Sequence, residues 1–284
     1  MPSLGERAYA YAKASGIIGK SFIGKRAQAI SNVNRLSELD RLIFPNSSRD
    51  LPEKELIPDL ETRISKRTID SVQRIIKSFN KPPKFFVLLT KELKRQNEGD
   101  LLQQTEQDRL YYNSLLQALQ KLKTSDRCVT QKILAEEISL RNAACALRLR
   151  TYYHLDAKEV VPHLIDIKMT LRGKRLLLAA DALSSLVMPL DSRESWTGWK
   201  REKFLNPSTG GSWTADPRYF QNTAAKYLYR MARHAFRFSP SSLDTVFCFI
   251  KMKQFEEDVL TSSAEGLRMG LSSGEVFSML GVES

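Results

Sequence analysis

Apolar residues in the last quarter of the chain recur at helical spacing. From about Arg218 to Phe236 they fall every three or four positions, which predicts a helix with one apolar face. A second helix is predicted to begin at Ser239-Pro240, a capping serine before a proline at the first helical position. Its apolar face continues to a stop at Gly270. Ser272 and Glu275 then form a predicted capping box that opens a short last helix.

The same periodicity runs through most of the remaining sequence. It predicts helices over residues 7–30, 36–43, 60–79 and 130–153, with residues 46–58 as a connection. Residues 81–83 interrupt the helical pattern, and residues 84–96 are apolar and then basic. Alternation of Val, Ile and Thr is scarce, and hairpin turns of the Asn-Gly or Asp-Gly type are absent. We therefore expect an all-α protein with negligible β-strand.

Two segments about 115 residues apart read alike. Residues 155–160 and 271–276 both follow the pattern L-[D/S]-x-x-E-V, and each comes after a long helix that contains Leu-Arg. In the first segment, Asp156 and Glu159 form another predicted capping box. Because capping boxes also recur independently of any repeat, these two matches indicate internal repetition but do not prove it.

The segment from Phe247 to Gly281 resembles the C-terminal signature of a V-type ATPase family, the bacterial and archaeal C subunits. That family is similar to the eukaryotic d subunit, and its signature reads E-x-x-N-L, then E-G and G-L-S-x-x-E. The residues that fit are Glu256, Leu260, Glu265, Gly266, Gly270, Leu271, Ser272 and Glu275. Val259 stands where the family usually has Asn.

Two further stretches extend this resemblance. Residues 136–153 resemble the family's repeated D-x-x-N-x-x-x-x-x-R element, with Asn142 and Arg148 in place and Ser139 where Asp is usual. The N-terminus matches the family's Y-x-Y-A-x-A opening at residues 9–14. The resemblance implies three similar multi-helix units arranged as a funnel with pseudo-threefold symmetry. We assign them approximately to residues 1–100, 101–190 and 191–284.

The resemblance also implies a function without chemistry. Members of the family are non-catalytic rotor subunits of the central stalk, which couple the D and F axle subunits to the membrane rotor ring and transmit torque for ion transport. We therefore expect a peripheral protein on the cytoplasmic face of the cell membrane, with no cofactor. The sequence contains no apolar run of about 18 residues, so no transmembrane segment is predicted. The charged N-terminus lacks the apolar core of a signal peptide, which predicts that the chain is not exported.

The net charge of +12 favours an acidic partner. Basic residues gather on the predicted helix 130–153 and near residue 174. The candidate partner-binding residues are Arg148, Arg150, Arg172, Lys174 and Arg175. We expect the last three to face the ring. The alternative is a basic helical nucleic-acid-binding protein, but the sequence carries no RRM, KH, helix-turn-helix or zinc-finger signature, so we expect no nucleic-acid partner.

Other motifs give no positive sign of catalysis, of a metal or of a cofactor. Residues 19–26 lack the final hydroxyl of a P-loop and follow a predicted helix instead of a strand, which argues against nucleotide binding in that manner. The acidic residues at 136–137 and 256–258 are interpreted as salt-bridge partners, not as an ion site. The three cysteines are too dispersed for a disulfide framework. The three tryptophans at 196, 199 and 213 are interpreted as cover for a core edge rather than as a partner hot spot.

Overall fold

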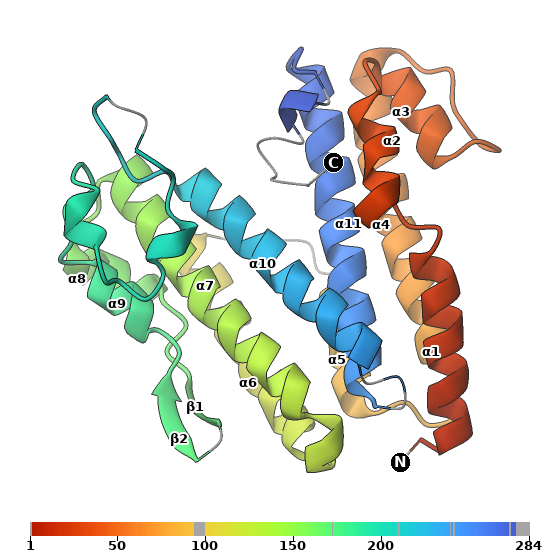
Figure 1. Cartoon of the computed structure of the whole chain (residues 1–284), viewed down its shortest axis with the longest axis horizontal. Helices are drawn as coiled ribbons and strands as arrows, with labels where there is room; N and C mark the ends of the chain where they lie inside the picture. The colour runs from red at the N-terminus through yellow and green to blue at the C-terminus, as the bar shows by residue number, and fades with distance from the viewer. Residues whose placement is uncertain are drawn as a thin grey trace. The chain divides into compact units, whose positions relative to one another are not determined.

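The chain is helical over most of its length in the computed structural model (Figure 1). The structure describes residues 2–93, 100–171, 173–208, 211–238, 240, 242–272 and 274–276. The all-α prediction is confirmed, and within these ranges the strands are confined to one two-stranded hairpin. None of the described helices is both long and apolar enough to cross a membrane.

The chain divides into two compact units. Unit 1 joins the two ends of the sequence, Met1–Lys94 and Tyr229–Ser284, and unit 2 is Arg95–Leu228. The boundary at Leu228 falls within one long helix, α10 (Pro217–Phe238). The division into three units around a funnel axis stays a prediction.

In unit 1, the helix α11 (Asp244–Arg268) packs along α4 (Glu53–Ile76) and also contacts α1 (Leu4–Ile18) and α3 (Leu36–Ile43), as Figure 1 shows. The shorter helices of this unit are α2 (Gln28–Ser31) and α5 (Lys84–Glu92). The apolar faces of these helices form the core, which includes Leu39, Leu60, Ile64, Val72, Phe85, Phe247, Ile250, Val259 and Leu260. Burial of these faces is the main force that holds the helices together.

Three predicted helix boundaries in unit 1 were wrong. The helix expected over residues 7–30 ends at Ile18 with Gly19 as its C-cap residue, and a non-helical turn separates it from the 3-10 turn at Gly24–Ala27. Glycine is a poor helix former, so this is a place where the helix can end at little cost. The helix α4 begins at Glu53, within the expected connection, and contains Pro58. A proline this close to a helix start interrupts few backbone hydrogen bonds, so the helix can include it. The helix α11 begins at Asp244 and not at Ser239-Pro240, and Ser239 lies outside the described residues.

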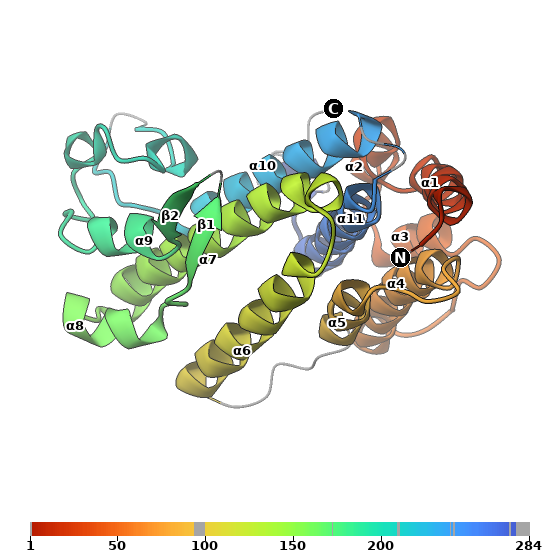
Figure 2. The ribbon, with the colours of Figure 1, turned by 90° about the horizontal axis from the view of Figure 1, so that it is seen from below.

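Unit 2 is built on two long helices, α6 (Leu101–Gln120) and α7 (Cys128–Tyr153). In Figure 2 both helices extend from the segment that joins them, residues 121–127. Short helices α8 (Ala157–Val160) and α9 (Ala180–Ser185) follow. The predicted capping box of Asp156 and Glu159 is confirmed at the start of α8. His154 ends α7 in a left-handed conformation with φ of 55°.

Unit 2 contains a short β-hairpin that the sequence analysis did not predict. Strands β1 (Lys168–Leu171) and β2 (Lys174–Leu177) pair antiparallel, with Leu171 opposite Lys174. Gly173 lies between them with φ of +78°, a conformation that glycine adopts without steric cost. The sequence rule missed this hairpin because its turn lacks Asn-Gly and Asp-Gly.

The three tryptophans confirm the core interpretation. Trp196, Trp199 and Trp213 are buried, and they pack with Phe204, Phe220 and the apolar face of α7. Each indole N–H donates to a backbone carbonyl, those of Pro189, Asp181 and Asn206 respectively. The loop therefore folds inward and supplies the aromatic core of unit 2.

Candidate partner-binding surface

The basic residues predicted on α7 lie in different environments. Arg148 is exposed near the C-terminal end of the helix. Arg150 is half-buried, and its guanidinium donates to the carbonyls of Ser185 at 2.7 Å and Met188 at 2.8 Å. Arg150 therefore ties the end of α9 to α7. Of the two, Arg148 has the charge that is free to meet a partner.

The second basic group lies on the hairpin. Lys174 and Arg175 are exposed on β2, and neither forms an ion pair within the described ranges. Arg172 lies outside the described residues. No hydrogen bond or ion pair among the described residues joins this group to Arg148.

Exposed apolar side chains surround the C-terminal end of α7. Tyr152 and Tyr153 at the end of the helix are exposed, as is Val161 just after α8. Val187, which follows α9, is 85% exposed. Sequence periodicity marks these residues as apolar but cannot show that they face solvent. We refer to Arg148, Tyr152, Tyr153, Val161 and Val187 together as the α7-end surface, because all five are exposed and lie on the last turns of α7 or directly after α8 and α9.

The signature residues of α11 are mostly buried and structural. Glu256 is 1% exposed, and its carboxylate accepts the backbone N–H of Phe22 at 2.7 Å. Lys253, also buried, is its ion-pair partner, and Arg67 lies 3.7 Å away. Burial lowers the pKa of Lys253, and Glu256 offsets part of this effect. The signature glutamate therefore anchors the turn that follows α1.

Steric requirements explain why glycine stands at two positions of the signature. A Cβ at Gly266 would lie 2.1 Å from a methyl carbon of Val276, so only glycine lets the last turn pack here. Gly270 has φ of +78° and ends α11 as predicted. The capping box is confirmed, because Ser272 N–H donates to Glu275 at 2.7 Å and Glu275 N–H returns to the Ser272 hydroxyl at 3.2 Å.

The related element in α7 also supports a connection outside the helix. Asn142 is buried, and its amide accepts from Ile165 N–H at 2.8 Å and donates to the carbonyls of Ile165 and Leu178. Ile165 precedes β1 and Leu178 follows β2. Asn142 therefore fixes both ends of the segment that carries the hairpin.

A buried charge network lies beside Asn142. The guanidinium of Arg201 binds Asp181 at 2.7 Å and Glu136 at 2.5 Å, and it also donates to the Ser139 hydroxyl. Burial alone would raise the pKa of Asp181. Hydrogen bonding from Ser139 and the charges of Arg201 and Lys200 outweigh burial, so the pKa of Asp181 is lowered. Glu136 is thus a salt-bridge partner, as predicted.

The described residues contain no cluster of three or more His, Cys, Asp or Glu side chains arranged to hold a metal ion. The near-P-loop segment follows α1 and includes a 3-10 turn over Gly24–Ala27. Its backbone is therefore not the strand-to-helix loop of a P-loop.

Comparison with known proteins supplies the decisive observation. Residues 47–276 match the family model described as ATP synthase (C/AC39) subunit. This chain belongs to that family. The match covers both long helices with signature elements, α7 and α11, and it supports a protein like the C and d subunits of V-type ATPases, as the sequence resemblance predicted.

One curated relative of this family member comes from Treponema pallidum (strain Nichols), where it is described as an uncharacterized protein. It is 31% identical over 172 residues, which cover 57% of this chain and 48% of the relative. The chain therefore spans about half the length of the curated relative that it matches.

Proposed function

We propose that this chain is a non-catalytic central-stalk component of a V-type ATPase, which couples the D and F axle subunits to the membrane rotor ring. The match of residues 47–276 to the ATP synthase (C/AC39) subunit family carries this proposal. In this role the protein is peripheral on the cytoplasmic face of the membrane and transmits torque for ion transport. Three helical units forming a funnel belong to the same proposal.

The packing described above supports a torque-bearing role. Each unit is closed by a long helix with a buried polar group, Glu256 in α11 and Asn142 in α7, that ties a distant segment to the helix. Such satisfied buried networks specify one arrangement and resist deformation. A part that transmits torque has to behave in this way.

Within this role we assign the hairpin cluster, Arg172, Lys174 and Arg175, to the ring side. We assign Arg148 to partner contact through the α7-end surface and Arg150 to support of that surface. The exposed charges of Lys174 and Arg175 support this assignment. Complementary charge at an interface speeds association and makes binding sensitive to salt.

Purification from membranes tests the proposal. A tagged chain should recover the D and F subunits and the ring protein from solubilised membranes of its own cell. Failure to recover any of these subunits, together with steeply salt-dependent binding to DNA or RNA, would support the nucleic-acid alternative and refute the rotor role.

A charge-reversal pair tests the interface assignment separately. The double variant Lys174→Glu, Arg175→Glu should stay folded, because exposed charges contribute little to stability, but should sediment less with ring-containing membranes as salt rises. The matched control is Lys121→Glu, Lys123→Glu, which reverses two exposed charges elsewhere in unit 2 and should sediment like wild type. Equal sedimentation of both variants would refute the ring assignment of the hairpin.

A further inference from the structure

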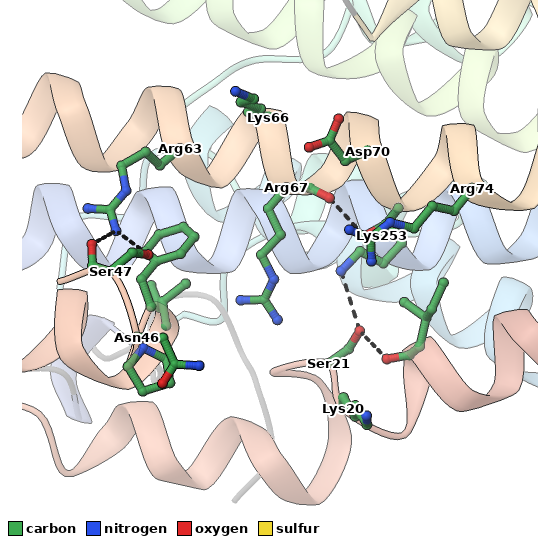
Figure 3. Close-up of a pocket in the computed structure, with 15 residues that line it drawn as sticks. Lys20, Ser21, Asn46, Ser47, Arg63, Lys66, Arg67, Asp70, Arg74 and Lys253 are labelled. Carbon is green, nitrogen blue, oxygen red and sulfur yellow. Dashed lines mark hydrogen bonds between the residues drawn. The ribbon is translucent and has the colours of Figure 1, made fainter.

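A cavity of about 680 Å³ lies within unit 1, between α1, α4, α11 and the segment Phe44–Ser47 (Figure 3). This volume lies within the range of about 300–1,000 Å³ that is usual for small-molecule sites. Its lining is strongly cationic. Six basic side chains and one acidic side chain, Asp70, line it; the basic ones are Lys20, Arg63, Lys66, Arg67, Arg74 and Lys253.

Three of the six cations already lie beside a carboxylate. Arg63 binds Asp40 at 2.8 Å and Asp59 at 3.2 Å, Lys253 is paired with Glu256, and Nη2 of Arg67 lies 3.7 Å from the same Glu256 carboxylate. Among the described residues, Lys20, Lys66 and Arg74 form no ion pair. The cavity therefore has an excess of positive charge over the carboxylates that face it, and a concave cationic surface concentrates anions.

Arg67 is the cation that bears most directly on whether this cavity binds an anion. Its side chain reaches from α4 toward the turn at Lys20 and Ser21, as Figure 3 shows. Its Nη1 atom is buried and has no hydrogen-bond acceptor among the described residues. The guanidinium is held over the ring of Phe22, 5.2 Å from its centroid. A buried guanidinium donor without an acceptor is uncommon in folded proteins, and the side chain that carries it lines the cavity.

Phosphate is the anion that this arrangement fits best. The guanidinium fork binds two phosphate oxygens at once, and lysine adds a point charge to the same group. The apolar side chains of Ile17, Ile43, Phe44 and Pro45 form another part of the lining. Apolar lining lowers the local dielectric and strengthens each charged hydrogen bond.

We propose that this cavity binds a small anion that carries more than one phosphate group, with Arg67 and Lys20 as its principal contacts. Several unpaired cations around one space favour a chain of phosphates over a single one. The site differs from a P-loop, because Lys25, the lysine of the near-P-loop motif, does not line the cavity. The proposal goes beyond the rotor role and does not depend on it.

Calorimetric titration of the full chain with inorganic tripolyphosphate at low salt tests the proposal directly. We expect saturable binding of one tripolyphosphate per chain, and affinity for orthophosphate at least tenfold weaker, which corresponds to about 1.4 kcal/mol. Absence of saturable binding at millimolar tripolyphosphate would overturn the proposal. So would an orthophosphate affinity equal to that of tripolyphosphate.

Variants locate the site. Arg67→Gln should weaken tripolyphosphate binding by about tenfold or more, and Lys20→Gln by a smaller factor. Lys20 is exposed, so its substitution leaves the fold intact even if Arg67→Gln disturbs the contacts near Glu256. The matched controls are Lys25→Gln and Lys54→Gln, exposed residues that do not line the cavity, and both should bind like wild type.

Two comparisons complete the test. If all four variants bind tripolyphosphate equally, or if the controls lose as much affinity as Lys20→Gln, the anion binds a diffuse surface charge and the proposal fails. ATP and vesicles containing a phosphoinositide distinguish the sources of phosphate. ATP binding that is lost in Lys20→Gln identifies a soluble phosphate, and vesicle binding lost in that variant identifies a lipid headgroup. Both outcomes support the site.

Discussion

The helices α7 and α11 each anchor a distant non-helical segment, but they do so with different residues. Each carries the three-residue spacing of the family element, Ser139 and Asn142 in α7 and Glu256 and Val259 in α11. In α11 the first position binds a distant backbone, through Glu256 and Phe22 N–H. In α7 the second position does so, through Asn142 and the flanks of the hairpin. In both helices, therefore, the element anchors a non-helical segment, and either of its two positions can supply the anchor.

The two anchors differ in charge. Asn142 is neutral and meets backbone groups alone, whereas Glu256 brings a buried negative charge that Lys253 must balance. In unit 2 the charged partners stand apart from the anchor, in the network of Arg201, Asp181 and Glu136. Removing the anchor should therefore cost more in α11 than in α7, since only there does it leave a buried charge alone.

The largest expected effect is that of Glu256→Ala. This change leaves Lys253 buried without its counter-charge and Phe22 N–H without its acceptor, so the free energy of unfolding should fall by about 3–5 kcal/mol. Urea denaturation measures it. The control Glu265→Ala removes a carboxylate from a more exposed pair on the same helix and should cost less than about 1 kcal/mol. Similar losses in the two variants would show that the buried pair is not an anchor.

In α7, Asn142→Leu should cost about 1–3 kcal/mol, because the backbone groups of Ile165 and Leu178 lose their buried partner. The reciprocal variant Val259→Asn tests whether the missing family residue could be restored in α11. Val259 is 1% exposed, so an amide placed there should also destabilise the protein, by about 1–3 kcal/mol. A Val259→Asn chain that unfolds at higher urea than wild type would break the comparison.

An effect of similar size is expected at the end of α11. Gly266→Ala places a methyl group against Val276, and such overpacking should cost about 1–3 kcal/mol. Gly16→Ala is the matched control, since its Cβ would meet nothing within 4 Å in α1. That control should raise stability by about 0.5–1 kcal/mol. Thermal unfolding distinguishes the two signs, and the double variant Gly266→Ala, Val276→Ala should recover most of the loss.

How far the sequence could predict these features depends on how local they are. The capping boxes at Asp156 and Ser272 and the stop at Gly270 were predicted correctly, because each involves residues a few positions apart. Burial of the tryptophans followed from residue type. The hydrogen bond between Phe22 and Glu256 spans 234 positions, and no periodicity connects two such residues.

The basic residues show the same limit. Sequence marks Arg148 and Arg150 as equivalent charges on one helix. The two carbonyls that occupy Arg150 lie 35 and 38 positions away, so its structural role emerges only from the fold. The break after α1 was missed because glycines also occur inside helices, and only the fold shows that α1 ends before Gly19. The hairpin was missed because it depends on the positive φ of Gly173, and many glycines do not take that conformation.

The smallest expected effect is a pH dependence in unit 2. The pKa of Asp181 is lowered from 3.8, so its stabilisation is fully present above that pH and is lost as pH falls through the lower, folded-state pKa. Wild type should therefore lose stability below about pH 4, and Asp181→Asn should show a flatter profile in that range. Urea midpoints from pH 7 to pH 2.5 measure the difference. Parallel profiles would mean that the network around Arg201 contributes no pH-dependent stability.

The discontinuity of unit 1 has a consequence for biosynthesis. The first 94 residues leave the ribosome before α11, and Glu256 follows roughly 160 residues later. At about 5–20 residues per second, that interval is on the order of 10–30 s. During it, Phe22 N–H lacks its acceptor and the apolar face of α4 lacks α11. Unit 2 is contiguous and can fold in that time, so the nascent first segment is the part of this chain that a chaperone has most reason to hold.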